Sequence, residues 1–320
     1  MTQGQLNKQQ VLTKEEAPSR AQRVLYADDI LFQCVRPYQK NNYIVKDVMS
    51  DIQWVASTGY AQIRTQIDNP TFLYYVLNTF KYNKAVMVRC TGSSYPAINS
   101  EDLSKIPFYK CGIAEQKKIG KFLSLLDERI TTQNKIIDKL QTLIRGIAHK
   151  VSKQGKPNIR LSECLLCTSS TLQESDVAEV GAYPVYGANG IVGYLDTYNT
   201  TSEAIYIIKD GSGVGAVSCV KGKCSATGTL NILQTKEGFS LRYLYFILKV
   251  FSFEPYKTGM AIPHIYFKDY GKAKIYCPSN QLQCKYADLL SKIEQKATAE
   301  QKILDNLCSQ KQYLLCQMFI

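Results

Sequence analysis

The sequence has two histidines and one tryptophan among its 320 residues. With so few imidazole groups, a Ser/His/Asp triad or a histidine-rich metal centre has little to be built from. There is no apolar run near the roughly 20 residues that a membrane-spanning helix needs, and the start, MTQGQLNKQQ, has no hydrophobic signal core. We therefore expect a soluble protein that is not exported and stays in the cytoplasm.

Acidic residues are in deficit. The 27 Asp and Glu face 39 Lys and Arg, which gives a net charge of +12 and a pI near 9.0. This excess favours a polyanionic partner over an acidic substrate, although solubility alone is the simpler explanation. No segment is a basic tail, so folding has to organise the charge.

Motifs for catalysis are also missing. The segment DGSGVGAV, residues 210–217, lacks the G-x-x-x-x-G-K-[ST] order of a phosphate-binding loop and continues as a strand. Neither a D/N-P-P-Y/F phrase nor a P-D-x-n-D/E-x-K arrangement stands out. We therefore expect a chain without catalytic residues.

Eleven cysteines are present, an odd number with irregular spacing. Such a pattern in a chain of this length indicates reduced thiols in a reducing compartment. Cys164 and Cys167 form a CxxC pair and Cys219 and Cys224 a looser one. A structural zinc needs four ligands in tetrahedral closure, so we expect no metal and interpret most of these cysteines as core residues.

What the sequence does contain is a long helix in two copies. From residue 115 to 151 apolar residues step by three and then four, interrupted by Arg129 and Gln133, and the pattern recurs 167 residues later with one charged break at Lys311. This spacing predicts a coiled-coil seam. The predicted seam residues are Ile119, Phe122, Leu126, Ile137, Leu140, Ile144, Ile147, Leu289, Ile293, Leu304, Leu307 and Leu314.

The repeat extends beyond the helices. TGSSYPAI (91–98) matches TGMAIPHI (258–265) at the same offset, and FLYYVLNTF (72–80) matches YLYFILKVF (243–251) at an offset of 171. Duplication is the economical account. A helix of this size is about 58 Å long and cannot be stable alone in water. Its nearest partner is its own copy, which predicts an antiparallel helix pair.

The segments between the helices have a different period. Short β-branched and aromatic runs separated by glycine and asparagine predict strands, and LRYLYFIL and FLYYVLNTF predict helices. The predicted strands are DDILFQCVRPYQ and GYAQIRT in the first copy, and LSECLL, YPVYG, IVGYLDTY, AIYIIK, GAVSCVKG and TLNILQT in the second. The strand at Ile30 aligns with that at Ile205, so the first copy starts late and has no counterpart of LSECLL.

These patterns predict an α+β fold: two small mixed α/β domains, each followed by a long helix, with the two helices forming an antiparallel coiled coil. The predicted boundaries are 1–112 for a first domain that is incomplete at its start, 113–151 for the first helix, 152–279 for the second domain and 280–320 for the second helix.

Four segments of the sequence carry a resemblance to a known family. They are IPFYKCGIAEQKKIGKFLSLLDERITTQNKIIDKL (106–140), YPVYGANGIVGYLDTY (183–198) and the two G-x-x-x-P-x-I segments. Over residues 20–320 the chain resembles the specificity subunit of type I restriction-modification systems. The motif E-Q-x-K-I-G-x-F-x-x-x-L-D after I-P is a specific signal of this family. In the second copy the corresponding residues are LQCKYAD (282–288), which match the motif poorly.

The resemblance implies a non-catalytic, sequence-specific DNA-binding subunit. Two target-recognition domains would each read one half of a bipartite sequence in double-stranded DNA, and the helices would set the gap between the half-sites. The implied partners are adenine-methylating modification subunits and ATP-driven restriction subunits. Those partners would use S-adenosylmethionine, ATP and magnesium, so this chain itself is expected to bind no cofactor.

The late start of the first domain departs from the family pattern and leaves an alternative open. The chain would then be a truncated or reservoir specificity protein, a scaffold with only one working DNA-reading domain. A third possibility is an independent enzyme that uses its cysteines with a bound metal.

Candidate DNA contacts are polar, basic and aromatic residues in the loops and strand ends of both copies, because such groups bind base edges and phosphates. A tyrosine in a strand is more often a half-buried sheet residue, and His264 is more often a structural residue of its loop. The candidates are Arg36, Tyr38, Lys40, Arg89, Thr91, Ser93, Ser94 and Tyr95 in the first copy, and Tyr183, Tyr186, Asn189, Tyr194, Tyr198, Lys209, Ser212, Lys221, Lys223, Lys257, Thr258 and His264 in the second.

Overall fold

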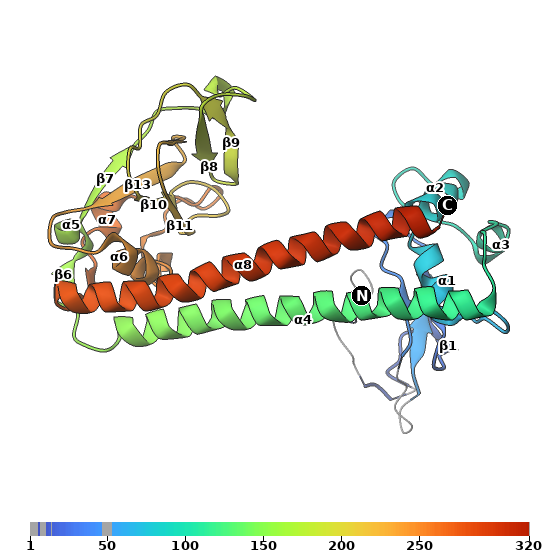
Figure 1. The fold of residues 1–320 in the computed structure, drawn as a ribbon. Helices are drawn as coiled ribbons and strands as arrows, with labels where there is room; N and C mark the ends of the chain where they lie inside the picture. Colours follow the sequence, from blue (N-terminus) through green and yellow to red (C-terminus); the bar gives the residue numbers. More distant parts are fainter. Residues whose placement is uncertain (1–5, 7–10, 14, 47–52, 320) are drawn as a thin grey trace. The chain divides into compact units, whose positions relative to one another are not determined.

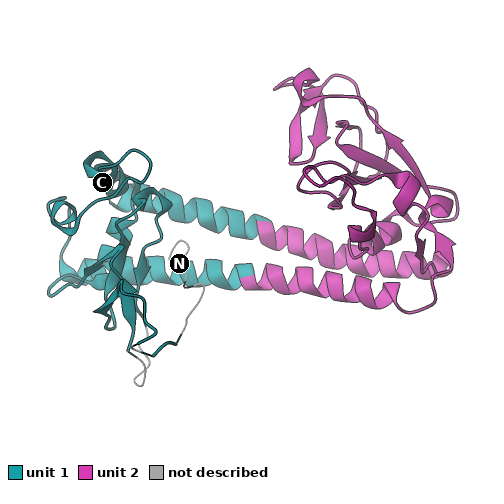
Figure 2. Ribbon diagram, turned by 180° about the vertical axis from the view of Figure 1, so that it is seen from behind, with its two compact units in different colours: residues 1–134, 302–320 teal, residues 135–301 magenta. Residues whose placement is uncertain are grey.

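The structure is a computed structural model that describes residues 6, 11–13, 15–46 and 53–319. The chain forms two compact units: residues 1–134 with 302–320 make unit 1, and residues 135–301 make unit 2 (Figure 2). Each unit contains part of both long helices, whereas the division predicted from the sequence separates helices from domains. The predicted domain boundaries therefore stay a prediction. Most of the MTQGQLNKQQ segment lies outside the described residues.

Unit 1 is built on a three-stranded antiparallel sheet of order β3-β2-β5, with a separate pair β1-β4. Its elements are β1 (Ala21–Val24), β2 (Ile30–Gln33), the 3₁₀ turn η1 (Pro37–Gln39), β3 (Tyr43–Ile44), β4 (Val55–Ser57), β5 (Tyr60–Ile63), α1 (Pro70–Leu77), α2 (Phe80–Arg89), α3 (Ser100–Ser104) and the first half of α4 (Ile113–Ser152). Ile30 and Phe32 of the central strand are buried against α1 and α2.

Unit 2 is built on a four-stranded sheet of order β11-β10-β13-β7, with a three-stranded sheet β12-β8-β9 and a pair β14-β6. Its elements are β6 (Ile159–Arg160), α5 (Leu161–Cys164), β7 (Leu165–Ser169), η2 (Glu174–Asp176), β8 (Tyr183–Gly187), β9 (Gly190–Leu195), β10 (Ala204–Ile208), β11 (Val217–Val220), β12 (Ser225–Ala226), β13 (Leu230–Thr235), α6 (Leu241–Leu248), η3 (Glu254–Tyr256), α7 (Phe267–Tyr270), β14 (Lys274–Ile275) and the first half of α8 (Asn280–Met318).

The two sheets share a core design, as the repeat predicts. Ile30 of β2 faces Ile63 of β5, and Ile205 of β10 faces Leu233 of β13. In each unit one short helix, α1 or α6, begins with a side-chain cap and buries its apolar residues against this sheet and the long helix. The predicted alignment of Ile30 with Ile205 is therefore confirmed as a shared central strand.

The long helices α4 and α8 run antiparallel within each unit (Figure 1). In unit 2, Ile144 and Ala148 of α4 belong to one core with Ala287 and Leu290 near the start of α8. In unit 1, Asp127 in the first part of α4 pairs with Lys311 near the end of α8 at 2.5 Å. That pair explains why a lysine interrupts the predicted apolar seam. No helix in the described part of the chain is long and apolar enough to cross a membrane.

Two predicted seam residues are wrong by one position. Phe122 and Leu289 are each 48% exposed, whereas their neighbours Leu123 and Leu290 are fully buried. Leu123 and Leu290 are themselves related by the 167-residue repeat. The seam near each domain turns toward α1 or α6 as well as toward the other long helix, so the apolar face there is wider than a two-helix seam.

Two other predictions need correction. LSECLL does not form one strand: Leu161–Cys164 make a helical turn, α5, and β7 begins only at Leu165. A capping hydrogen bond from the Arg160 N–H to the Glu163 carboxylate starts that turn. In the first copy the helix predicted at 72–80 ends at Leu77, and a second helix, α2, begins at Phe80 because Thr79 caps it.

Candidate nucleic-acid interface

Each candidate reading domain is attached to a long helix by a buried glutamine. Gln116, in the predicted E-Q-x-K-I-G phrase, accepts from the Asn69 N–H at the start of α1 (2.9 Å) and donates to the Cys111 carbonyl. Gln283, its counterpart 167 residues later, accepts from the Ser240 N–H at the start of α6 (3.0 Å) and donates to the Pro278 carbonyl. One amide therefore fixes the start of the short helix to the start of the long helix in both copies.

An acidic residue on each long helix makes the second attachment. In unit 1 the Tyr75 hydroxyl donates to Asp127 at 2.8 Å, and in unit 2 the Tyr245 hydroxyl donates to Glu294 at 2.7 Å. Burial, together with the nearby carboxylate, raises the pKa of both tyrosines, so both hydroxyls stay protonated as donors. Asp127 and Glu294 are again 167 residues apart.

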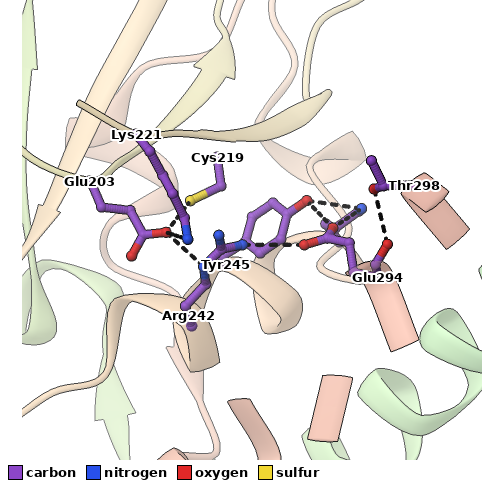
Figure 3. Close-up of polar contacts among 8 residues, drawn as sticks. Glu203, Cys219, Lys221, Arg242, Tyr245, Glu294 and Thr298 are labelled. Atoms are coloured by element: carbon purple, nitrogen blue, oxygen red, sulfur yellow. Dashed lines mark hydrogen bonds and ion pairs between the residues drawn. The ribbon is translucent and has the colours of Figure 1, made fainter. Parts of the chain in front are cut away.

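In unit 2 this attachment extends to the sheet (Figure 3). The Arg242 guanidinium lies between Glu203, at 2.7 Å, and Glu294, at 3.2 Å. Glu203 also pairs with Lys221, at 3.6 Å, and accepts from the Cys219 thiol. Arg242 thereby joins α8 to the loop before β10 and to β11. Lys221, a predicted DNA contact, is thus partly neutralised by Glu203.

A small hairpin repeats in the same form in both units. Thr91 and Ala97 exchange two backbone hydrogen bonds of 2.9 Å, and Thr258 and His264 exchange two of 2.9 and 2.8 Å. Gly92 and Gly259 take left-handed conformations with φ of +90° and +87°, which glycine adopts without strain. The tips, residues 92–95 and 259–262, are exposed. The duplicated TGSSYPAI and TGMAIPHI segments therefore present one exposed loop each.

In unit 1 this hairpin brings together Arg36 and Tyr95, two predicted contacts. The guanidinium carbon lies 4.2 Å from the Tyr95 ring centroid, and the Arg36 N–H donates to the Pro96 carbonyl at 2.7 Å. Arg36 has φ of 54°, a left-handed conformation that is uncommon outside glycine. In unit 2 the corresponding backbone position, which bonds Pro263 in the same way, is Gly211. A half-buried cation on an exposed aromatic ring suits a phosphate or a base face.

In unit 2 the hairpin gathers a different set. His264 packs edge-on against Tyr266 at 5.2 Å between ring centroids, and the Lys268 ammonium lies 5.1 Å from the Tyr266 ring. Asp210 pairs with His264 as an isolated bridge, so Lys209 and Ser212 border the same hairpin. Tyr266 and Lys268 were not predicted. Their spacing of two and four residues after His264 was the available signal.

A second group of unit 2 comes from three distant segments. Tyr183 and Tyr198 meet edge-on at 4.9 Å, and the Lys223 ammonium lies 4.8 Å from the Tyr198 centroid and 5.8 Å from that of Tyr183. Lys223 is exposed in the tight turn after Gly222, whose φ is +81°. We call these three residues the tyrosine–lysine cluster. It combines a positive charge with aromatic surface.

The other predicted contacts take no part in the aromatic and cationic groups described above, although Thr91, Ser93, Ser94 and Thr258 belong to the hairpins themselves. Tyr186 is half-buried against Tyr206, which fits the sheet role left open for it, and Tyr194 is half-buried in β9. Lys257 pairs with Glu254 at 2.5 Å and Arg89 donates to the Ala85 carbonyl at the end of α2. Tyr38, Ser93, Ser94, Thr91, Asn189 and Thr258 are exposed, and Lys40 is half-buried.

The cysteines behave as core and surface thiols. All eleven are free, and four of them, Cys34, Cys164, Cys224 and Cys277, are buried. Burial raises the pKa of Cys164 to about 12 and that of Cys167 to about 11, so neither is a ready thiolate ligand. Within the described ranges no three cysteine, histidine or acidic side chains come together as a metal site.

Comparison with known proteins gives one family. The family described as "Type I restriction modification DNA specificity domain" matches residues 5–142 and 164–308. A type I restriction enzyme EcoprrI specificity subunit from Escherichia coli is 26% identical over 112 residues. That alignment covers 35% of this chain and 28% of the relative.

Two solved structures share the fold. The type I restriction-modification S subunit from M. genitalium matches with a TM-score of 0.68 at 20% identity, over 92% of this chain and 83% of that one. A chain from a structure described as the basis of complex assembly and conformational transition of the type I R-M system matches with a TM-score of 0.55 at 20% identity. That match covers 95% of this chain and 84% of the other.

Proposed function

Since the chain belongs to the family of type I restriction-modification DNA specificity domains, we propose that it reads a bipartite sequence in double-stranded DNA. Each unit would read one half-site through its repeated hairpin and the groups beside it. The chain itself would be non-catalytic and would bind no cofactor. S-adenosylmethionine, ATP and magnesium would be bound by partner subunits.

The observation that carries the proposal is the duplication of an exposed loop on a duplicated anchor. Thr91 with Ala97 and Thr258 with His264 hold equivalent hairpins, while Gln116 and Gln283 tie each domain to its helix in the same way. Two equivalent loops whose side chains differ suit two half-sites of different sequence. Arg36 on Tyr95 in unit 1 and His264 with Tyr266 in unit 2 are such a difference.

The side chains near the loops suit a duplex. Exposed Lys223 and half-buried Arg36 carry positive charge for phosphates. The hydroxyl groups of Ser93 and Ser94 and the amide of Asn189 can bond to base edges. The net charge of +12 supports association with a polyanion and predicts strong salt dependence.

The exposed surface of the two long helices is the proposed docking site for modification subunits. Their buried faces are used by the helix pair and by α1 and α6. Outward-facing apolar residues remain, among them Leu125, Leu143 and Ile303. Restriction subunits would join through the modification subunits.

One observation favours a second candidate, a scaffold with a single working reader. The main sheet of unit 1 has three described strands, and that of unit 2 has four. Unit 1 would then hold partner subunits without reading DNA, and sequence specificity would come from unit 2 alone.

Footprinting of the purified chain with its modification subunit on selected DNA separates these functions. Two working readers protect two half-sites with an unprotected gap, and the affinity falls steeply with salt. Protection of one half-site assigns the scaffold function. Equal binding to selected and scrambled DNA would remove both.

A further inference from the structure

Arg64 is an exposed arginine of unit 1 that a buried carboxylate holds in place. It directly follows β5, and 54% of its side chain is exposed. Its Nε and Nη2 groups donate to the two carboxylate oxygens of Asp29 at 2.7 and 2.8 Å. Because Asp29 is fully buried, one edge of the guanidinium is fixed at the surface of the sheet.

The carboxylate of Asp29 is itself fixed by two further donors. The Tyr26 N–H donates to it at 2.8 Å, and the Gln62 amide donates to it at 2.7 Å. Gln62 lies in β5, two residues before Arg64, and also donates to the Val24 carbonyl at 2.9 Å. The carboxylate therefore cannot turn without breaking several hydrogen bonds, and its position sets that of the guanidinium.

An aromatic ring covers one face of the same guanidinium. The Arg64 Cζ lies 4.6 Å from the Tyr26 ring centroid, and Tyr26 is 58% exposed. Stacking on an aromatic face fixes the plane of a guanidinium as well as stabilising its charge. With one edge held by Asp29 and one face held by Tyr26, Arg64 has little side-chain freedom left to lose when it binds a partner.

The remaining donors of Arg64 decide what it can bind. A guanidinium has five N–H groups, and the pair with Asp29 uses one on Nε and one on Nη2. The other edge keeps one N–H on Nη2 and one on Nη1, which are parallel and in one plane. Among the residues that the structure describes, no other group accepts a hydrogen bond from Arg64. This edge fits a partner with two adjacent acceptors.

DNA has two such partners, a phosphate and a guanine, and charge distinguishes them. Phosphate binding gains from uncompensated positive charge, whereas Asp29 compensates the charge of Arg64 at 2.7 Å. The O6 and N7 atoms of guanine are neutral acceptors, and in the major groove guanine is the one base that presents two adjacent acceptors. A fixed, charge-compensated guanidinium therefore favours guanine over phosphate.

The location of Arg64 has a parallel in unit 2. Tyr198 of the tyrosine–lysine cluster lies in the segment that leads into β10, the central strand of that unit. Tyr26 lies in the segment that leads into β2, the equivalent strand of unit 1. Each unit thus has a cation on an exposed tyrosine before its central strand, and a hairpin that bridges to the residues after it.

The Arg64–Asp29 pair itself occurs in unit 1 and not in unit 2. Arg64 follows the residue of β5 that pairs with Ile30, and Gln234 follows the residue of β13 that pairs with Ile205. Ala204 likewise takes the place of Asp29 before the central strand. A base contact made by this pair would therefore belong to one half-site only.

We propose that Arg64 reads a guanine in the half-site of unit 1, with Asp29 and Tyr26 as its positioning residues. Its Nη1 and Nη2 groups donate to O6 and N7 of that base. This contact rests on the proposed function of unit 1 as a DNA reader, and it assigns one base of the half-site.

The test compares two proteins by selection of DNA from a random library, each with the modification subunit. The variant combines Asp29→Asn with Arg64→Met, which removes the pair and leaves the net charge unchanged. Replacing one guanine of one selected half-site by adenine should weaken wild-type binding about 10-fold or more, and should weaken binding of the variant less than threefold. The other half-site should be the same for both proteins.

The salt dependence separates a base contact from a phosphate contact. Because the double variant keeps the net charge, loss of a base contact leaves the slope of log affinity against log salt unchanged. A slope that is lower by about one in the variant would assign Arg64 to a phosphate and overturn the proposal. Arg20→Met, at an exposed arginine of the same unit, is the control and should change the guanine preference less than twofold.

Arg64→Lys is a second variant, should the double variant fail to show the fluorescence of folded Trp54. It keeps a charge beside Asp29, but one ammonium cannot hold the carboxylate and also present two donors in one plane. The guanine preference should therefore fall about threefold or more. Full preference for every guanine in a folded variant overturns the role of Arg64 and leaves the proposed function standing. A wild-type protein that selects no half-site overturns both.

Discussion

Asp29 is a buried carboxylate in unit 1 whose charge is fully paired. It accepts from Arg64 at 2.7 and 2.8 Å, from Gln62 at 2.7 Å and from the Tyr26 N–H at 2.8 Å. Burial alone would raise the pKa of Asp29, but the hydrogen bonds from Arg64, Tyr26 and Gln62 outweigh it, and the pKa is lowered. Asp29 therefore stabilises unit 1 as an anion.

Asp29→Asn should destabilise unit 1 by about 1–3 kcal/mol at pH 7, because charge-assisted hydrogen bonds are lost while Arg64 remains exposed to water. A carboxyl with a lowered folded-state pKa contributes stability above its unfolded pKa of about 3.9, and loses it as the pH falls through the folded value. The gap between wild type and variant should thus be constant from pH 7 to 5 and shrink below pH 4.

Urea unfolding followed by fluorescence measures this gap, since Trp54 is the only tryptophan and packs beside Leu25 and Leu31 in unit 1. Asp28→Asn is the control: Asp28 is exposed and has φ of 68°, which asparagine tolerates. An equal loss in both variants, or a gap that widens in acid, would show that Asp29 is not a paired anion.

Lys223 is the residue of the tyrosine–lysine cluster whose charge should matter most for DNA. Lys223→Met should weaken binding to all DNA sequences by a similar factor and lower the slope of log affinity against log salt by about one. Lys156→Met, a matched change at an exposed loop lysine, should do neither. A change in the preferred sequence, or an unchanged salt slope, argues against a phosphate contact.

For single residues, the sequence indicated which types of side chain could contact DNA, but not which other side chains each of them would meet. Lys223, Tyr183 and Tyr198 were each predicted as candidate DNA contacts, but their meeting depends on how β8 and the loops after β9 and before β12 come together, which a sequence does not give. Tyr266 and Lys268 were missed because their segment resembles a positioning loop. The role of Asp29 could not be predicted, since it depends on Arg64, which directly follows β5 and is 35 residues away in the sequence.

Among the elements, α4 has two glycines with opposite expected roles. A Cβ on Gly120 would lie 2.9 Å from the Asn69 side chain and 3.1 Å from the Phe72 nitrogen, whereas one on Gly146 would meet nothing within 4 Å. Gly120 permits α1 to start directly against α4. Gly146 has no such contact and lowers helix propensity.

Gly120→Ala should therefore destabilise unit 1 by about 1–3 kcal/mol through the forced shift of α1. Gly146→Ala should stabilise the protein by about 0.5–1 kcal/mol through helix propensity. Urea unfolding followed by circular dichroism at 222 nm compares the two. The same sign for both substitutions would contradict the packing of α1 on α4.

The helix seam gives another matched pair. Ile144 is buried with Ala287 and Leu290 in unit 2, while its neighbour Leu143 is exposed. Ile144→Asp should lower the unfolding free energy by about 3 kcal/mol or more, because it buries an unpaired charge. Leu143→Asp should change it by less than about 0.5 kcal/mol. Similar stability of both variants would mean that α4 does not use this face.

The elements were the most predictable level. Periodicity and repetition predicted α4, α8 and the central strands, because their patterns are long or occur twice. The one-residue error at Phe122 and Leu289 arose because the three–four spacing of a coiled coil assumes that a helix packs against a single partner helix. Each long helix also packs on α1 or α6. The turn at α5 was missed because a capping carboxylate, Glu163, was read as part of a strand.

For the whole molecule, the central claim is that two DNA readers share one helix pair, so that the gap between half-sites is part of the recognised sequence. The claim rests on the repeated hairpins, the repeated glutamine anchors and the family to which the chain belongs. It predicts that helix length sets the gap while the domains set the half-sites.

The most direct test is selection of DNA from a random library by the chain with its modification subunit. Wild type is compared with a variant that carries four extra residues in α4 after Gln133 and four in α8 after Gln301, which lengthens the pair by about 6 Å. The account predicts the same two half-sites in both selections, with a gap longer by about one or two base pairs in the variant. An unchanged gap, or a single uninterrupted motif, would contradict it.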